Sequence, residues 1–158
     1  MYAVRLWSVR HSRKLEAFYQ GFENLLLRLA PVWQRLGHAR LERPVAAFER
    51  GVKGLLFDCQ MCGQCALSST GMSCPMNCPK NLRNGPCGGV RANGHCEVKP
   101  EMRCVWVKAV ERAPKTPWAH ELADLRPPVD NRLWGTSSWR NFLSKRDKET
   151  PKGWHVAP

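Results

Sequence analysis

The residues of this chain whose side chains are best suited to carry out chemistry are its eight cysteines. All of them lie between residues 59 and 104. Thiolates at short spacings bind metal ions and iron–sulfur clusters. Eight thiolates can hold two cubane clusters with four ligands each, so the sequence predicts two [4Fe-4S] centres. The predicted cofactor-binding and metal ligands are Cys59, Cys62, Cys65, Cys74, Cys78, Cys87, Cys96 and Cys104.

The spacing of the cysteines favours iron–sulfur clusters over zinc. Two residues separate Cys59 from Cys62 and Cys62 from Cys65, as at the start of bacterial ferredoxin motifs. Proline follows Cys74 and Cys78, and the ferredoxin run also ends in Cys-Pro. Eight residues separate Cys65 from Cys74, however, and ferredoxins have three before their last cysteine, so a ferredoxin fold is not implied.

Two other uses of the cysteines would fit part of the pattern. A zinc-stabilised interaction module without a redox role is the alternative, and His95 beside Cys96 would suit it, because zinc sites often include histidine. Disulfides of a secreted domain would fit the even number of cysteines. We reject them because no signal-peptide pattern opens the chain and the first three cysteines lie too close together for separate bridges. We expect a cytoplasmic protein without a membrane span, since no run of about 18 apolar residues occurs.

The division of the cysteines between two centres is left open by spacing alone. We expect Cys59, Cys62 and Cys65 to share one centre with the distant Cys104, which leaves the remaining four for the other. Ferredoxins exchange fourth ligands between their clusters, so Cys78 is an alternative partner for the first three. Residues 57–104 show neither helical nor strand periodicity, and their folding should therefore depend on the bound centres.

Helices are predicted on both sides of the cysteine segment. Residues 12–30 form an amphipathic pattern that Pro31 should end or kink. A second helix is expected over residues 44–53, and a third over residues 100–112 with Cys104 on its first turns. The predicted apolar stripe of the first helix consists of Leu15, Phe18, Tyr19, Phe22, Leu25, Leu26 and Leu29.

The chain after residue 113 is rich in proline and lacks periodicity, yet it contains four tryptophans. Because disordered tails are poor in aromatic residues, we predict an extended docking arm over residues 114–158. Trp118, Trp134 and Trp139 are expected to fill pockets on a partner, and the alternative is that the arm wraps its own domain. The predicted fold is mainly α, with a helical segment over residues 1–53, an irregular cysteine-rich metal-cluster core over residues 54–113, and the arm.

Composition and motifs limit the classes of function that the chain is expected to have. No dinucleotide-binding glycine pattern, phosphate loop or nucleophile elbow is present, so an electron-transfer or structural subunit is favoured over a catalytic one. The net charge of +12 suits an acidic protein partner or a phosphate-bearing ligand. We do not expect nucleic acid as a partner, because the tryptophans that could stack on bases lie mostly outside the metal-binding segment.

The cysteine motifs resemble those of one family. The matching strings are Cys59-Gln-Met-Cys62-Gly-Gln-Cys65, Cys74-Pro, Cys78-Pro-Lys80, Asn84-Gly-Pro-Cys87-Gly-Gly89, Cys96-Glu-Val and, in the tail, Leu125-Arg-Pro-Pro128. They are similar to the cysteine-rich C-terminal domain of certain methylenetetrahydrofolate reductases, which in acetogen-type two-subunit enzymes occurs as a separate small subunit. The resemblance covers about residues 54–112 and the Leu125 stretch.

The resemblance implies a function for the chain. It implies an iron–sulfur accessory subunit of a flavin-dependent methylenetetrahydrofolate reductase-like enzyme in one-carbon folate metabolism. Such a subunit would pass electrons to the catalytic barrel subunit or support it structurally. FAD or FMN and folate would bind to that partner only, and a further electron donor is conceivable in such a heteromer. Zinc has also been considered for subunits of this kind.

Overall fold

The structure is a computed structural model that describes residues 2–36 and 38–149, and its mainly helical character confirms the predicted class. The α-helices are α1 (Tyr2–Arg10), α2 (Ser12–Leu36), α3 (His38–Phe57), α4 (Val105–Arg112) and α5 (Ser138–Leu143). Short 3-10 helices are η1 (Pro75–Asn77), η2 (Ala113–Lys115), η3 (Ala119–Ala123), η4 (Asn131–Leu133) and η5 (Arg146–Lys148). Within the described ranges, extended pairing is limited to the isolated antiparallel bridges Val90–Cys96 and His95–Arg103. No helix in those ranges is long and apolar enough to cross a membrane.

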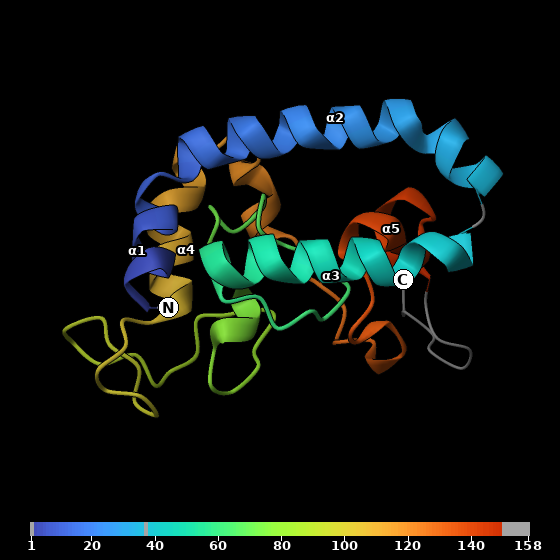
Figure 1. The fold of residues 1–158 in the computed structure, drawn as a ribbon. Helices are drawn as coiled ribbons and strands as arrows, with labels where there is room; N and C mark the ends of the chain where they lie inside the picture. The colour runs from blue at the N-terminus through green and yellow to red at the C-terminus, as the bar shows by residue number, and fades with distance from the viewer. Residues whose placement is uncertain (1, 37, 150–158) are drawn as a thin grey trace.

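The two longest helices, α2 and α3, form the framework of the fold. Figure 1 shows α2 and α3 running side by side, with α1 and α4 packed together near one end and α5 near the other. Much of the cysteine segment lies below α3 and α4 in that view, but part of it rises between α3 and α2, where Leu15 and Tyr19 of α2 pack against it. The helices therefore form a scaffold against which the cysteine loops pack.

The first predicted helix forms as α2, but it continues through Pro31 to Leu36. Its predicted apolar stripe is only partly used for packing. Leu26 is buried, whereas Phe18 is 74% exposed and Leu25 is 52% exposed. Because seven residues span nearly two helical turns, Phe18 and Leu25 lie on the same edge of the helix. The stripe is wider than the surface available to cover it, so one edge faces outward.

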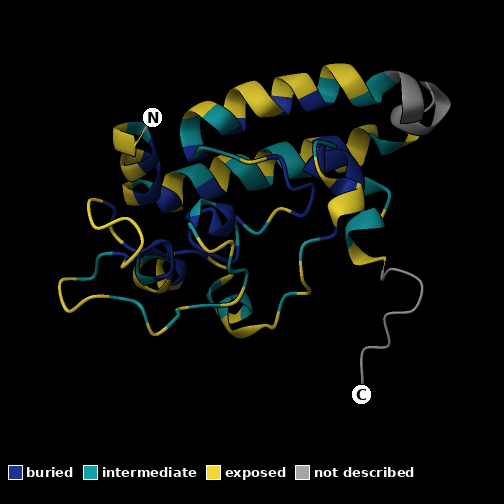
Figure 2. Cartoon of the chain, turned by 90° about the horizontal axis from the view of Figure 1, so that it is seen from below, coloured by how far each residue is buried: buried dark blue, intermediate teal, exposed yellow. Residues whose placement is uncertain are grey.

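The cysteine segment consists of turns, as its lack of periodicity predicts. Phe57, Leu67 and Met72 form a buried core with two of the cysteines. In Figure 2 the buried residues concentrate where these loops meet the helices. α4 begins at Val105, later than predicted, because the preceding residues are held in a turn in which the backbone N–H of Cys96 donates to the Met102 carbonyl (3.0 Å).

The chain beyond α4 does not project as an arm up to residue 149, but packs back onto its own domain. α5 contacts α2, and Trp139 on α5 is only 7% exposed. The prediction that Trp139 fills a pocket on a partner is therefore wrong, because the chain itself provides the pocket. Trp118 and Trp134 are 37% and 47% exposed. Residues 150–158 of the predicted arm lie outside the described residues.

Candidate functional site

The fold gathers the eight cysteines around two cavities. We call the four that line one cavity the first quartet and the four that line the other the second quartet. The first quartet is Cys59, Cys62, Cys65 and Cys74, and the second is Cys78, Cys87, Cys96 and Cys104. All eight are free thiols.

This arrangement differs from the division expected from the sequence, because Cys74 and Cys104 exchange places. The backbone N–H of Cys104 donates to the carbonyl of Gly94 (2.9 Å), in the turn directly before Cys96. Cys104 is the N-terminal cap residue of α4, so it does not lie on the helix itself. The turn at Gly94 thus keeps Cys104 beside Cys96 and away from the first three cysteines.

A sharply turning loop after α3 positions the first quartet. Asp58, Met61 and Gly63 have φ values of 55°, 52° and 76°, which lie in the left-handed region. A side chain at Gly63 would place its Cβ 2.3 Å from the carbonyl oxygen of Leu133, so glycine is required for that close approach. The backbone N–H of Met61 donates to Cys59 Sγ (3.4 Å). The loop therefore turns its backbone toward a cysteine sulfur and is held by the chain after α4.

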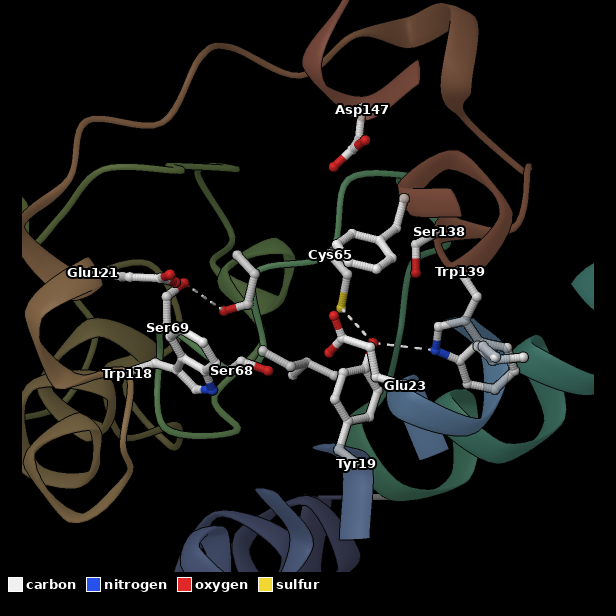
Figure 3. A pocket seen from close by; sticks show the side chains of 14 residues that line it. Tyr19, Glu23, Cys65, Ser68, Ser69, Trp118, Glu121, Ser138, Trp139 and Asp147 are labelled. Atoms are coloured by element: carbon white, nitrogen blue, oxygen red, sulfur yellow. Dashed lines mark hydrogen bonds between the residues drawn. The ribbon is translucent and has the colours of Figure 1, made fainter. Parts of the chain in front are cut away.

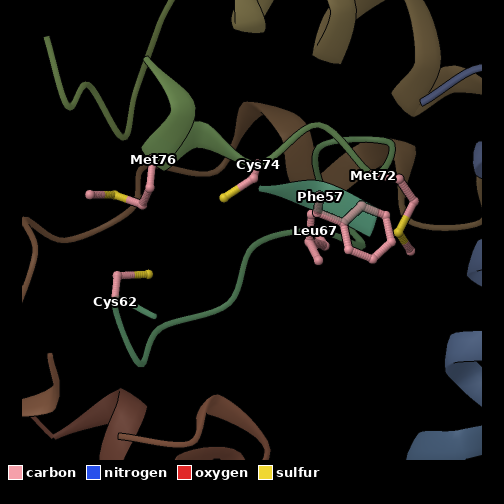
Figure 4. Close-up of a cluster of buried hydrophobic side chains, with 6 residues drawn as sticks. All are labelled: Phe57, Cys62, Leu67, Met72, Cys74 and Met76. Carbon is pink, nitrogen blue, oxygen red and sulfur yellow. The ribbon is translucent and has the colours of Figure 1, made fainter. Parts of the chain in front are cut away.

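Apolar side chains enclose part of the first quartet. Figure 4 shows the sulfur atoms of Cys62 and Cys74 pointing into the same space, with Met76 beside them. Cys62 and Cys74 are each 8% exposed, whereas Cys65 is exposed and forms the rim. The inner side of this cavity is therefore buried, and Cys65 marks its exposed edge.

The second quartet is organised around Trp106 on α4. The Trp106 indole lines the cavity and donates from Nε1 to the Leu82 carbonyl (3.1 Å). A Cβ at Gly85 would lie 2.5 Å from the Trp106 ring, which explains the glycine in the Asn84-Gly85-Pro86 string. The bridge between Val90 and Cys96 closes the hairpin-like turn. The second quartet thus has an aromatic floor that the sequence pattern did not predict.

Burial disfavours ionisation of the inner thiols. Burial raises the pKa of Cys59 to about 11 and also raises the pKa of Cys62. Burial, with the neighbouring thiols of the first quartet, raises the pKa of Cys74 still further above the ordinary value. A strong positive charge beside these sulfurs would favour their thiolate forms, and a metal centre is one group that could supply it.

Basic side chains stand beside both quartets. The Lys53 ammonium lies 3.5 Å from Cys65 Sγ, and Arg83 lines the first cavity and lowers the pKa of Cys62 against the effect of burial. At the second quartet, Lys80 Nζ lies 3.9 Å from Cys87 Sγ and pairs with Glu97. These cations would partly balance anionic thiolate centres.

Lys53 is the residue of this site that sequence reasoning missed. It is 1% exposed and pairs with Glu49, also 1% exposed, at 2.8 Å. Burial lowers the pKa of Lys53, but Cys65, Tyr19 and Glu49 outweigh that effect and hold it well above its usual value. The available signal was the four-residue spacing of Glu49 and Lys53, which usually marks an exposed helical pair.

An open cavity of about 340 Å³ adjoins the first quartet at Cys65. Figure 3 shows the Cys65 sulfur and the Tyr19 hydroxyl facing this space, with Trp139 on one side and Trp118 on the other. Cys65 lines both this cavity and the first quartet's cavity. The first quartet is therefore reached from outside the protein through its Cys65 edge.

The thiols do not form a preassembled ligand sphere for one ion. In the part of the chain that the structure describes, no three histidine, cysteine or acidic side chains converge closely enough to hold a metal ion. His95 is partly buried, and its Nδ1 lies 3.2 Å from the carbonyl oxygen of Asn93. It does not line either quartet's cavity.

Comparison with known proteins identifies the family. The family described as methylene-tetrahydrofolate reductase C terminal matches residues 38–132, which is well over half of the chain. No curated protein and no solved structure matches the chain. The matched range includes all eight cysteines, α3 and the whole lining of the second cavity. The chain therefore belongs to the methylene-tetrahydrofolate reductase C-terminal family.

Proposed function

We propose that the chain is an iron–sulfur accessory subunit of a flavin-dependent methylenetetrahydrofolate reductase-like enzyme. The observation that carries this proposal is the gathering of eight free thiols into two quartets, each around its own cavity. Four thiolates are the usual ligand set of a [4Fe-4S] cluster. Each quartet would hold one such cluster, and family membership supports a role beside a reductase of this type.

The residues around the quartets suit this cofactor. The first cavity offers apolar walls, a backbone N–H aimed at Cys59 and the cations Lys53 and Arg83. Donors and positive charges near cluster sulfurs offset the negative charge of the bound centre. When bound, such clusters supply one-electron transfer. The chain holds the sulfur ligands, excludes water from the inner side and leaves Cys65 at the rim as the point of contact.

The partner in this proposal is the flavin-bearing barrel subunit, which binds folate and performs the hydride chemistry. The edge of α2 at Phe18 and Leu25 is the surface that would receive it. Leu29, 40% exposed, extends the same edge by a further turn. Apolar side chains that lie in a row and remain uncovered are typical of protein interfaces. The accessory role includes both electron transfer and support of this partner.

The metal content tests the cofactor. Anaerobically prepared protein is expected to contain about eight iron and eight acid-labile sulfide per chain, as two four-iron centres require. The measurements are iron, zinc and sulfide analysis with absorption spectroscopy. Stoichiometric zinc without labile sulfide after anaerobic reconstitution would favour the alternative, a zinc-stabilised structural module without a redox role.

The docking surface is tested by a Phe18→Asp/Leu25→Asp variant. Two charges on the exposed edge of α2 should weaken binding to the flavin-bearing reductase subunit of the same organism by about 30-fold or more, equivalent to about 2 kcal/mol. Affinity is measured on the iron-loaded protein. Leu125→Asp is the control, because Leu125 is an apolar residue that is 88% exposed but does not belong to α2. Equal affinities of both variants for the reductase subunit would show that the interface does not include this edge of α2.

A further inference from the structure

Lys53 is an ammonium group that the fold encloses almost completely beside a cysteine of the first quartet. Its Nζ lies 2.8 Å from the Glu49 carboxylate, 2.8 Å from Ser138 Oγ and 3.5 Å from Cys65 Sγ. The Tyr19 hydroxyl is 3.3 Å from the same nitrogen. A lysine has three N–H donors, so these four acceptors share them, and the Cys65 sulfur is one of the four.

The surroundings of Lys53 fix both its charge and its direction. Glu49 accepts a hydrogen bond from Ser137 Oγ (2.6 Å) and another from the Ser138 hydroxyl, so its carboxylate is held in place. The Lys53 Nζ lies 4.8 Å from the centre of the Trp139 ring, which closes the site from the other side. A buried ammonium is unfavourable unless it is paired, and Glu49 provides the pairing. Lys53 is thus a fixed positive charge beside Cys65 rather than a mobile surface side chain.

We propose that Lys53 is a positioning residue that donates a hydrogen bond to Cys65 and raises the reduction potential of the first quartet's cluster above that of the second. This inference rests on the proposed iron–sulfur function. Reduction adds one electron to an already anionic centre and breaks no bond. A nearby positive charge stabilises the more negative reduced form more than the oxidised form, so it raises the potential.

Among the described residues, no buried ammonium hydrogen-bonds to a sulfur of the second quartet. Lys108 on α4 is 5% exposed and lies near Cys104, but its Nζ is 3.5 Å from the Tyr2 hydroxyl. Lys80 stands 3.9 Å from Cys87 Sγ, but its side chain is 38% exposed and pairs with the 45% exposed Glu97. Water and salt screen such a surface pair, and Glu97 offsets its charge. At the first quartet Glu49 likewise offsets Lys53, but that pair is buried and therefore little screened, and Arg83 adds a further positive charge that lines the cavity. The expected order of potentials favours electron flow from the second cluster to the first, which reaches the outside at Cys65.

The test is a redox titration of anaerobically prepared full-length protein, followed by electron paramagnetic resonance. Lys53→Met should lower the potential of the first cluster by at least about 59 mV, which is a tenfold decrease in the one-electron equilibrium constant. Glu49→Gln should raise that potential, because Glu49 lines the first cavity and carries the opposing charge. The first cluster's signal is identified as the one that Cys74→Ala removes.

Two further variants keep the test decisive. Lys53→Met alone leaves a buried carboxylate without its partner, so Lys53→Met/Glu49→Gln is included as a neutral pair that avoids this cost. Its potential should lie between those of the single variants. Arg50→Met removes the same charge from an exposed position of α3 and should leave both potentials unchanged.

The outcomes separate this inference from the function on which it rests. Two clusters whose potentials are the same in the wild type, the single variants and the neutral pair would overturn the role of Lys53 and leave the iron–sulfur function intact. Absence of iron and labile sulfide from the wild type would overturn both. Opposite shifts from Lys53→Met and Glu49→Gln, confined to the first cluster, would support the inference.

Discussion

Replacing Cys59 and Cys104 together by alanine is expected to remove both clusters, whereas replacing Cys59 and Cys74 together should remove only one. The first pair takes one ligand from each quartet, and the second takes two from the same quartet. The Cys59→Ala/Cys74→Ala protein should retain roughly half of the iron and sulfide of the wild type, since one four-iron centre remains. Iron and sulfide analysis after anaerobic reconstitution measures the difference.

The same two proteins discriminate between the division seen in the structure and the one expected from the sequence. If Cys104 shared a centre with Cys59, the Cys59→Ala/Cys104→Ala protein would keep half of its iron and the other would keep none. Single replacements serve as controls, because Cys74→Ala and Cys104→Ala should each lose one centre. Near-equal iron loss in both double variants would contradict either division and indicate that ligand loss unfolds the whole cysteine segment.

The parts of the molecule that could be predicted from sequence are those that depend on local spacing. The Cys-x2-Cys-x2-Cys run and the Cys-Pro steps carried the family resemblance, and the family match confirms it. The apolar repeat over residues 12–30 predicted a helix that the structure contains.

The assignment of cysteines to cavities could not be predicted, because it depends on contacts between distant segments. Cys104 is held in the second quartet by a backbone hydrogen bond to Gly94, and no sequence pattern predicts such a bond. Lys53 presented a similar difficulty. A glutamate and a lysine four residues apart read as an exposed helical pair, and only the packing of α5 over α3 reveals that Glu49 and Lys53 are buried.

The C-terminal tryptophans could not be assigned for a related reason. An aromatic side chain in a segment without periodicity gains the same apolar burial whether it covers its own chain or a partner. Sequence therefore indicated that Trp139 is an anchor but not what it is anchored to. The structure distinguishes it from Trp134, which lies nearby in sequence but is nearly half exposed.

Trp139→Ala is expected to destabilise the protein by about 3–5 kcal/mol, the usual range for removal of a buried tryptophan. The indole packs against Phe22 with ring centres 4.6 Å apart, and its Nε1 donates to the Tyr19 hydroxyl (3.1 Å). Its ring also faces Lys53, so its loss opens the side of the first quartet at Cys65. Denaturant unfolding of the iron-loaded protein under anaerobic conditions gives the free energy of unfolding.

Trp134→Ala is the matched control, because it removes the same side chain from a position that is 47% exposed. We expect it to change the free energy of unfolding by no more than about 0.5 kcal/mol, as surface substitutions usually do. Binding to the flavin-bearing subunit is measured on both variants. Wild-type stability of Trp139→Ala together with weakened binding would restore the role of this tryptophan as a docking anchor. Lower stability with unchanged affinity of the folded fraction would establish that the segment carrying it covers the first quartet and not the partner.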